Sequence, residues 1–208
     1  MSQMERGQIN MYTPIGKVLF DLIEQDTSIK SILDVGSWNG LGTTLCCVLG
    51  ATARLVYKPV YIIAVEANPE FFEKGKQAWE KRPGKEMIFF YKGRIAESMM
   101  TDAEIRAHST FDGLKPHYDL WYKSDIKHFN ESQRLELNGQ IDLAILDGGE
   151  YCGFQDYLAV LKCNPKYLVL DDYKTMKNDK SLEHALKNGF SVVFKNDERN
   201  GSIILRRT

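Results

Sequence analysis

A short apolar run that turns on glycine constrains this chain more than any other stretch. Residues 32–35 are apolar apart from Asp34. Gly36 and Gly40 follow this run, and a second apolar segment covers residues 45–49. This order is typical of a buried parallel strand, a tight loop and the start of a helix. Such a loop places backbone N–H groups at the carboxyl end of a central strand, and its glycines let a ligand lie directly on the main chain.

The rest of the chain repeats an alternation of strands and helices. We expect strands at residues 31–35, 60–65, 87–91, 141–146, 167–170, 190–195 and 202–206. We expect helices at residues 15–25, 45–49, 68–79, 97–107, 154–161 and 181–187. Apolar strands between helices are typical of a parallel sheet covered on both faces, and the turn-forming residues 196–201 predict a closing antiparallel hairpin. The sequence therefore predicts one doubly wound, Rossmann-like α/β domain over residues 1–208, with a mostly parallel seven-stranded sheet.

The composition limits the cellular compartments and the classes of binding partner that we expect for the protein. A net charge of −1 and a pI of about 6.4 offer no basic footprint for nucleic acid or for an anionic membrane. The four cysteines lack metal-ligand spacing and lie in apolar segments, which indicates reduced thiols in the core. The polar N-terminal residues 1–12 lack the apolar core of a signal peptide, and no apolar run could cross a bilayer. We expect a soluble, cytoplasmic protein.

The glycine loop suggests a cofactor. Gly36, Gly40 and Gly42 do not match the G-x-G-x-x-G nicotinamide fingerprint. With Asp34 they resemble the first motif, D-x-G-x-x-x-G, of class I S-adenosylmethionine-dependent methyltransferases, which implies that cofactor and the strand order 3-2-1-4-5-7-6. Glu66 ends the second strand, where a carboxylate can accept hydrogen bonds from both ribose hydroxyls. The cofactor-binding residues we expect are Asp34, Gly36, Ser37, Gly40, Thr43, Glu66, Ala67, Arg94, Ile95 and Asp147. The alternative is a purely structural turn.

Three aspartates follow the fourth and fifth expected strands. Asp147 ends the fourth strand, while Asp171 and Asp172 end the fifth. Neighbouring strands lie about 4.8 Å apart, so three like charges would meet and would need a cation between them. Carboxylate oxygens are ligands that Mg²⁺ prefers. The alternative is that Asp147 begins a turn and the other two cap the next helix.

A narrower resemblance rests on the residues around these aspartates. Asp147-Gly148-x-x-Tyr151, followed by Val-Leu-Asp-Asp-Tyr over residues 169–173, resembles the metal-dependent sugar O-methyltransferases of the macrocin O-methyltransferase family. The resemblance implies Mg²⁺ or Mn²⁺ on Asp147, Asp171 and Asp172, beside the acceptor hydroxyl. Gly149 departs from the pattern, because the family usually has an aspartate there.

These residues lead to a function and its rivals. We expect an O-methyltransferase in which Asp147 and Glu150 are catalytic, with Glu150 either the general base or a support for the metal ligands. By resemblance the acceptor is a sugar hydroxyl, such as that of a rhamnose-type deoxyhexose on a glycan or glycoside. One alternative acceptor is a catechol or another phenol. Another alternative is a non-catalytic cofactor-binding module of a glycan-assembly complex. The chain could act as a homo-oligomer or as a module of a larger glycosylation protein.

The connection between the third and fourth expected strands is unusually long. Residues 97–140 carry Trp121, Tyr122, His117 and His128 among polar residues. A connection of this length is typical of a functional lid or of a short packing insertion. We expect a lid over the acceptor.

Overall fold

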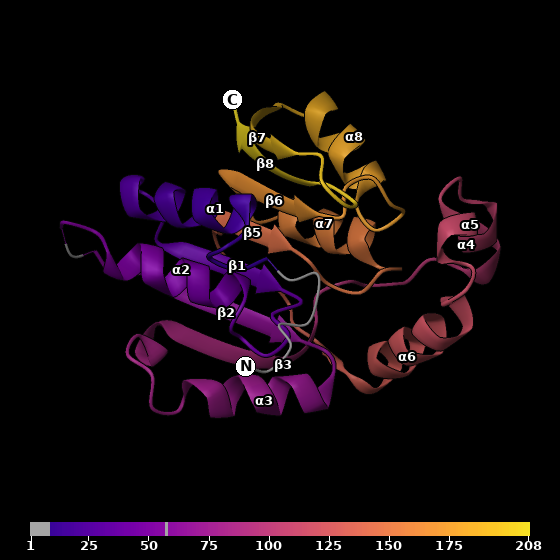
Figure 1. The fold of residues 1–208 in the computed structure, drawn as a ribbon, viewed down its shortest axis with the longest axis horizontal. Helices are drawn as coiled ribbons and strands as arrows, with labels where there is room; N and C mark the ends of the chain where they lie inside the picture. Colours follow the sequence, from indigo (N-terminus) through magenta and orange to yellow (C-terminus); the bar gives the residue numbers. More distant parts are fainter. Residues whose placement is uncertain (1–8, 57) are drawn as a thin grey trace.

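The computed structural model describes residues 9–56 and 58–208. The remainder of the polar N-terminal stretch, residues 1–8, lies outside the described residues. One twisted sheet runs through the molecule, and helices cover both of its faces (Figure 1).

The sheet has eight strands, and its order in space is β4-β3-β2-β1-β5-β6-β8-β7. β8 pairs antiparallel with both β6 and β7, while the other neighbours pair in parallel. The strands are β1 (Ser31–Val35), β2 (Tyr61–Glu66), β3 (Ile88–Arg94), β4 (Gln133–Arg134), β5 (Leu143–Leu146), β6 (Tyr167–Asp171), β7 (Phe190–Asn196) and β8 (Ser202–Arg207).

The helices begin at recognisable caps. Thr13 caps α1 and is followed by proline, Asn68 caps α3, and Thr101 forms a capping box with Glu104 at the start of α4. None of the helices in the described part of the chain has the length and apolar character needed to cross a membrane. The helices are α1 (Pro14–Gln25), α2 (Thr43–Thr52), α3 (Pro69–Trp79), α4 (Asp102–Ala107), α5 (Phe111–Leu114), α6 (Tyr118–Glu131), α7 (Gly153–Leu161) and α8 (Asp179–Lys187), with a 3₁₀ turn at Lys85–Met87.

The core lies in two layers, one on each face of the sheet. Successive strand residues point to opposite faces. Ile32 and Ile145 therefore join the layer that contains residues of α1 and α2, while Leu33 and Leu146 join the layer that contains residues of α7 and α8. All four side chains are buried, which explains why neighbouring positions of both strands are apolar on the two faces of the sheet.

The insert between β3 and β5 lies beyond the carboxyl ends of the strands (Figure 1). It contains α4, α5, α6 and the short β4. Ile105, Phe111 and Tyr118 of the insert form a third apolar cluster with Tyr151 and Met176, which follow β5 and β6. The insert is thus packed against the loops at one end of the sheet.

The observed sheet confirms the predicted order of the seven expected strands and the closing hairpin, but the predicted number of strands was wrong. β4 adds an eighth strand at the edge, pairing Gly93 with Gln133 and Arg94 with Arg134. A strand of this length is too short to produce a hydrophobic period. β3 also extends to Arg94, past the predicted end at residue 91, because β4 supplies its hydrogen-bonding partner.

Asp34 joins the central strand to the helix that follows the glycine loop. The carboxylate is fully buried in β1 and accepts hydrogen bonds from Thr43 Oγ1 at 2.8 Å and Thr44 Oγ1 at 2.5 Å, both in the first turn of α2. Burial raises the pKa of Asp34 to about 6, and the two hydroxyls oppose that shift. The aspartate therefore fixes where α2 begins.

Replacing Thr44 with valine should lower the free energy of unfolding by about 1–3 kcal/mol, because a buried carboxylate loses a donor while the side-chain volume is kept. Urea denaturation measures the change. Thr52→Val on the same helix is the control, since the exposed Thr52 hydroxyl contacts only carbonyls of α2. Equal losses in the two variants would contradict the role given to Asp34.

Candidate functional site

A cavity of about 490 Å³ lies at the carboxyl ends of β1, β2, β3 and β5. Gly36 and Trp38 line it from the loop after β1, and Glu66 and Ala67 line it from the end of β2. Its size lies within the range of about 300–1,000 Å³ that is usual for small-molecule sites. The strand ends of an open α/β sheet are also where such ligands bind.

Gly36 allows three strand ends to meet at this cavity. Its φ is +81°, and a Cβ placed on it would lie 2.1 Å from the carbonyl oxygen of Asp147. The backbone N–H groups of Gly36 and Ser37 both donate to Val65 O, at 3.0 and 3.1 Å. Glycine is therefore required here by the neighbouring main chain of β5, in addition to any ligand.

Several expected cofactor residues lie behind the cavity wall. Gly36, Glu66, Ala67, Arg94 and Asp147 line the cavity. Gly40 instead packs against Trp79: Trp79 Nε1 donates to Gly40 O at 2.8 Å, and a Cβ on Gly40 would approach that nitrogen to 2.9 Å. The expected cofactor residues outside the lining are Asp34, Ser37, Gly40, Thr43 and Ile95.

Glu66 orders the loop around the cavity as well as lining it. Its Oε2 accepts from the backbone N–H of Trp38 and its Oε1 from that of Asn68, each at 2.8 Å. Burial raises the pKa of Glu66 to about 7, against the effect of the two backbone donors. Each carboxylate oxygen can still accept a further hydrogen bond from a ligand.

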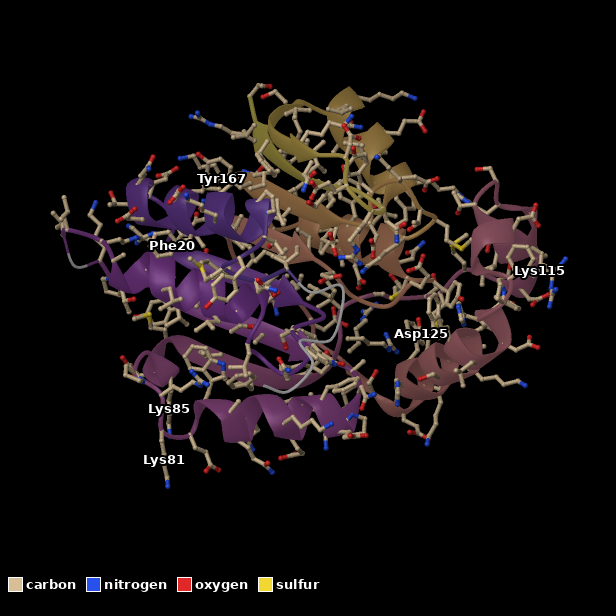
Figure 2. The ribbon with its side chains drawn as sticks, viewed as in Figure 1. Phe20, Lys81, Lys85, Lys115, Asp125 and Tyr167 are labelled. Atoms are coloured by element: carbon tan, nitrogen blue, oxygen red, sulfur yellow. The ribbon has the colours of Figure 1, made fainter. Side chains whose placement is uncertain are left out.

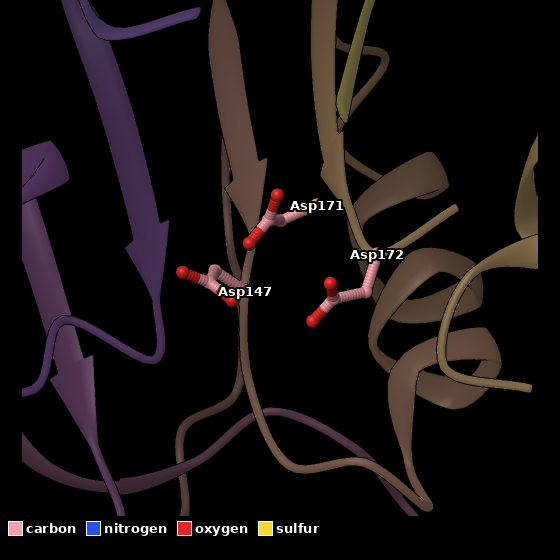
Figure 3. A group of neighbouring side chains, drawn as sticks. All are labelled: Asp147, Asp171 and Asp172. Atoms are coloured by element: carbon pink, nitrogen blue, oxygen red, sulfur yellow. The ribbon is translucent and has the colours of Figure 1, made fainter. Parts of the chain in front are cut away.

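The three predicted aspartates lie close together at the ends of β5 and β6 (Figure 3). Asp147 lines the cavity, whereas Asp171 and Asp172 line a second, smaller cavity. One carboxylate oxygen from each of Asp147, Asp171 and Asp172 lies within 4.8 Å of the others. Burial and the nearby Asp147 raise the pKa of Asp171 to about 8. The donor set fits a hard divalent cation, because Mg²⁺ takes carboxylate oxygens and keeps several waters.

A lysine that the sequence reasoning missed also enters this cluster. Lys177 Nζ lies 2.6 Å from Asp147 Oδ1 and 3.5 Å from Asp172 Oδ2. Burial alone would lower the pKa of Lys177, but Asp147, Asp172 and Asp171 outweigh burial and raise it. Lys177 lies in a polar segment with no motif, so no sequence signal marked it.

Glu150 lies beside the cluster and outside the cavity lining. Burial raises its pKa to about 7. Its Oε1 is buried without a hydrogen-bond partner among the residues that the structure describes. An ionisable carboxyl group with one unpaired oxygen near Asp172 suits the expected proton acceptor, which stays a prediction.

The outer wall of the cavity comes from the insert. Ser124, Asp125, His128 and Phe129 of α6 line it, and Figure 2 shows Asp125 on the side of α6 that faces the strands. These four positions lie on one face of a helix, but their spacing could have identified them as lining residues only if α6 had been predicted first. Trp121 of α6 lies outside the lining, is 41% exposed, and stacks on His117.

Two contacts hold α6 against the sheet. Asp125 Oδ2 accepts from the backbone N–H of Glu150 at 3.1 Å. Arg94 Nε donates to Phe129 O at 3.0 Å, and its guanidinium lies 4.0 Å from the centre of the Phe129 ring. The end of β3 and the loop after β5 are therefore both tied to the insert.

Comparison with solved structures places this arrangement in a known fold. Neither protein-family models nor curated proteins match the chain. An O-methyltransferase from Bacillus cereus in complex with SAH is similar, with a TM-score of 0.60, 12% identity, and coverage of 94% of this chain and 82% of that one. A protein assigned as a caffeoyl-CoA O-methyltransferase from Staphylococcus aureus has a TM-score of 0.59 and 10% identity, with coverage of 93% of this chain and 83% of that one. A methyltransferase from Geobacter sulfurreducens has a TM-score of 0.56 and 11% identity, with coverage of 94% of this chain and 79% of that one. The chain therefore has the Rossmann-like methyltransferase fold.

Replacing Asp125 with alanine should loosen the insert from the loop after β5, because the amide of Glu150 loses its acceptor. Hydrogen–deuterium exchange at the Glu150 amide should accelerate by about fivefold or more, which corresponds to a loss of about 1 kcal/mol. Asp119→Ala, at an exposed position of α6, is the control. Unchanged exchange in Asp125→Ala would show that α6 is held without this contact.

Proposed function

We propose that the chain is an S-adenosylmethionine-dependent O-methyltransferase that uses Mg²⁺ or Mn²⁺ and methylates a sugar hydroxyl. The observation that carries the proposal is the double position of Asp147, which lines the cavity and belongs to the aspartate cluster. A ligand in the cavity and an oxygen held at the cluster would therefore meet at this residue. Methyl transfer requires this juxtaposition, since its rate depends on aligning the nucleophile with the methyl group.

The residues of the cavity fit the cofactor. Glu66 offers carboxylate oxygens to two neighbouring hydroxyls, as the ribose of a nucleoside presents. In the lining, the carboxyl groups of Glu66, Asp125, Asp147 and Asp156 outnumber the guanidinium groups of Arg94 and Arg199, which would suit a ligand with a positive charge, such as a sulfonium. The bound cofactor would supply the methyl group. The neighbour from Bacillus cereus was solved in complex with SAH, which is consistent with this part of the proposal.

The residues of the cluster would orient the acceptor. Asp147, Asp171 and Asp172 would hold the divalent cation, which would supply Lewis-acid activation of a hydroxyl. Glu150 would accept the hydroxyl proton, because it lies beside Asp172 with an unpaired buried oxygen. The insert would exclude water through α6 and would contact the acceptor through residues such as Ser124 and His128.

The paired Asp171-Asp172 sequence supports the sugar acceptor, because the resemblance to the sugar O-methyltransferases includes a second aspartate at this position. A phenolic acceptor is the second candidate. It is favoured by the similarity to the Staphylococcus aureus protein, whose assigned substrate carries a phenolic group. The aspartate cluster argues against a non-catalytic cofactor-binding module, because such a module needs no metal site.

Replacing Glu66 with glutamine should weaken S-adenosylhomocysteine binding by about thirtyfold, since a charged acceptor of two hydroxyl donors is worth about 2 kcal/mol. The wild-type affinity should also fall as pH drops below about 7, because the raised pKa of Glu66 means that the carboxylate becomes protonated there. Isothermal titration calorimetry measures both effects, with the exposed Glu70→Gln as control. Wild-type affinity in Glu66→Gln would refute the ribose assignment.

The reaction itself is tested by methyl transfer to a rhamnose-type glycoside and to a catechol, each with Mg²⁺ or with EDTA. We expect product from the glycoside, no turnover in EDTA, and recovery when Mg²⁺ or Mn²⁺ is restored. Asp171→Asn should lower kcat by about a hundredfold or more, because loss of a metal ligand removes stabilisation of the transition state.

Each part of this result can fail separately. Methylation of the catechol alone would overturn the sugar acceptor, and full activity in excess EDTA would overturn the metal. Transfer to neither acceptor, with S-adenosylhomocysteine still bound, would leave only the cofactor site.

A further inference from the structure

Lys177 differs from the other ion-paired lysines and arginines of the described residues. Its side chain is 6% exposed, whereas the cationic partner in each of the other lysine and arginine ion pairs of residues 9–56 and 58–208 is at least 32% exposed. Exposed pairs contribute little to stability, while a buried cation requires close partners. Its partners are Asp147 and Asp172, two residues of the aspartate cluster.

The main chain around Lys177 delivers it to this place. The next residue, Asn178, donates from Nδ2 to Asp171 O at 2.7 Å and to Leu146 O at 3.1 Å, and so binds the ends of β6 and β5. On the other side, a Cβ on Gly153 would lie 2.0 Å from Lys177 O, so the start of α7 packs directly on this backbone. The ammonium group is therefore positioned by the fold and does not reach the cluster by side-chain flexibility alone.

The ammonium group uses the oxygens that a divalent cation would need. Lys177 Nζ is 2.6 Å from Asp147 Oδ1. Mg²⁺ would bind such an oxygen at about 2.0–2.1 Å. Two cations on the same carboxylates would repel each other strongly in a buried site.

We propose that Lys177 is the resident cation of the aspartate cluster and that its ammonium group competes with a divalent metal ion for Asp147 and Asp172. Lys177 then keeps the carboxylates together when no metal is bound and lowers the affinity for the metal when it is present. The inference rests on the metal component of the proposed function and is independent of the cofactor and the acceptor.

The test is Mn²⁺ binding and thermal stability of Lys177→Gln, which removes the charge and keeps a polar side chain of similar length. In EDTA its Tm should fall below that of the wild type, because the carboxylates lose their counter-ion. Its Mn²⁺ affinity, measured by electron paramagnetic resonance of the free ion, should rise by about tenfold or more, and Mn²⁺ should raise its Tm more than that of the wild type. Lys180→Gln, at an exposed position of α8, should match the wild type in every measurement.

A second pair of variants covers the case in which Lys177→Gln does not fold. Asp172→Asn removes one carboxylate from the cluster, so the double variant Lys177→Gln/Asp172→Asn carries less uncompensated charge. The double variant should bind Mn²⁺ more tightly than Asp172→Asn alone, because only the lysine differs between them.

Equal or weaker Mn²⁺ binding after removal of the lysine, in either background, would overturn the competition. Absence of Mn²⁺ binding in all variants would overturn it together with the metal component of the proposed function. S-adenosylhomocysteine binding, measured on the same samples, would then show whether the cofactor component stands.

Discussion

The close approach of the loop after β1 to the end of β5 is the constraint on which the rest of the site depends. Asp147 N donates to Val35 O at 2.9 Å, and the same Asp147 presents its carbonyl oxygen where Gly36 has no side chain. The neighbouring N–H groups of the loop bond Val65 O of β2. Three parallel strands thus end at one point, and their side chains must share one space.

That shared space concentrates buried acids. The acids whose pKa is raised by burial around the cavity and cluster include Glu66, Asp125, Asp156 and Asp171. Burying such groups is unfavourable unless donors or cations compensate. Backbone N–H groups serve Glu66 and Asp125, while Lys177 serves the aspartate cluster.

The insert completes the site because it has its own apolar anchor. Tyr151 follows the aspartate at the end of β5 and packs edge-on against Tyr118 and Tyr122 of α6. Residues of the loop after β5 therefore also bind the insert. A single segment after β5 couples the cluster to the outer wall, so a shift of α6 would be felt at Glu150 through Asp125.

Most strands and helices outside the insert, and the chemistry of the strand ends, could be predicted from the amino-acid sequence, whereas α5, α6 and β4 of the insert could not. The buried parallel strands are mostly apolar, and the caps at Thr13, Asn68 and Thr101 are local signals. The strand order implied by the resemblance placed the three aspartates together. The D-x-G-x-x-x-G pattern located the loop, although Gly40 is needed for packing against Trp79.

Which charges are neighbours and which residues face the cavity depends on how distant segments pack, and could not be predicted from the sequence. Lys177 and Asp125 come from segments without a motif, and their roles depend on a loop path and a helix orientation. The two-residue β4 was invisible because its strand exists only through pairing with β3. Local sequence patterns predict the secondary structure of a segment, whereas contacts between distant segments depend on packing that no single segment encodes.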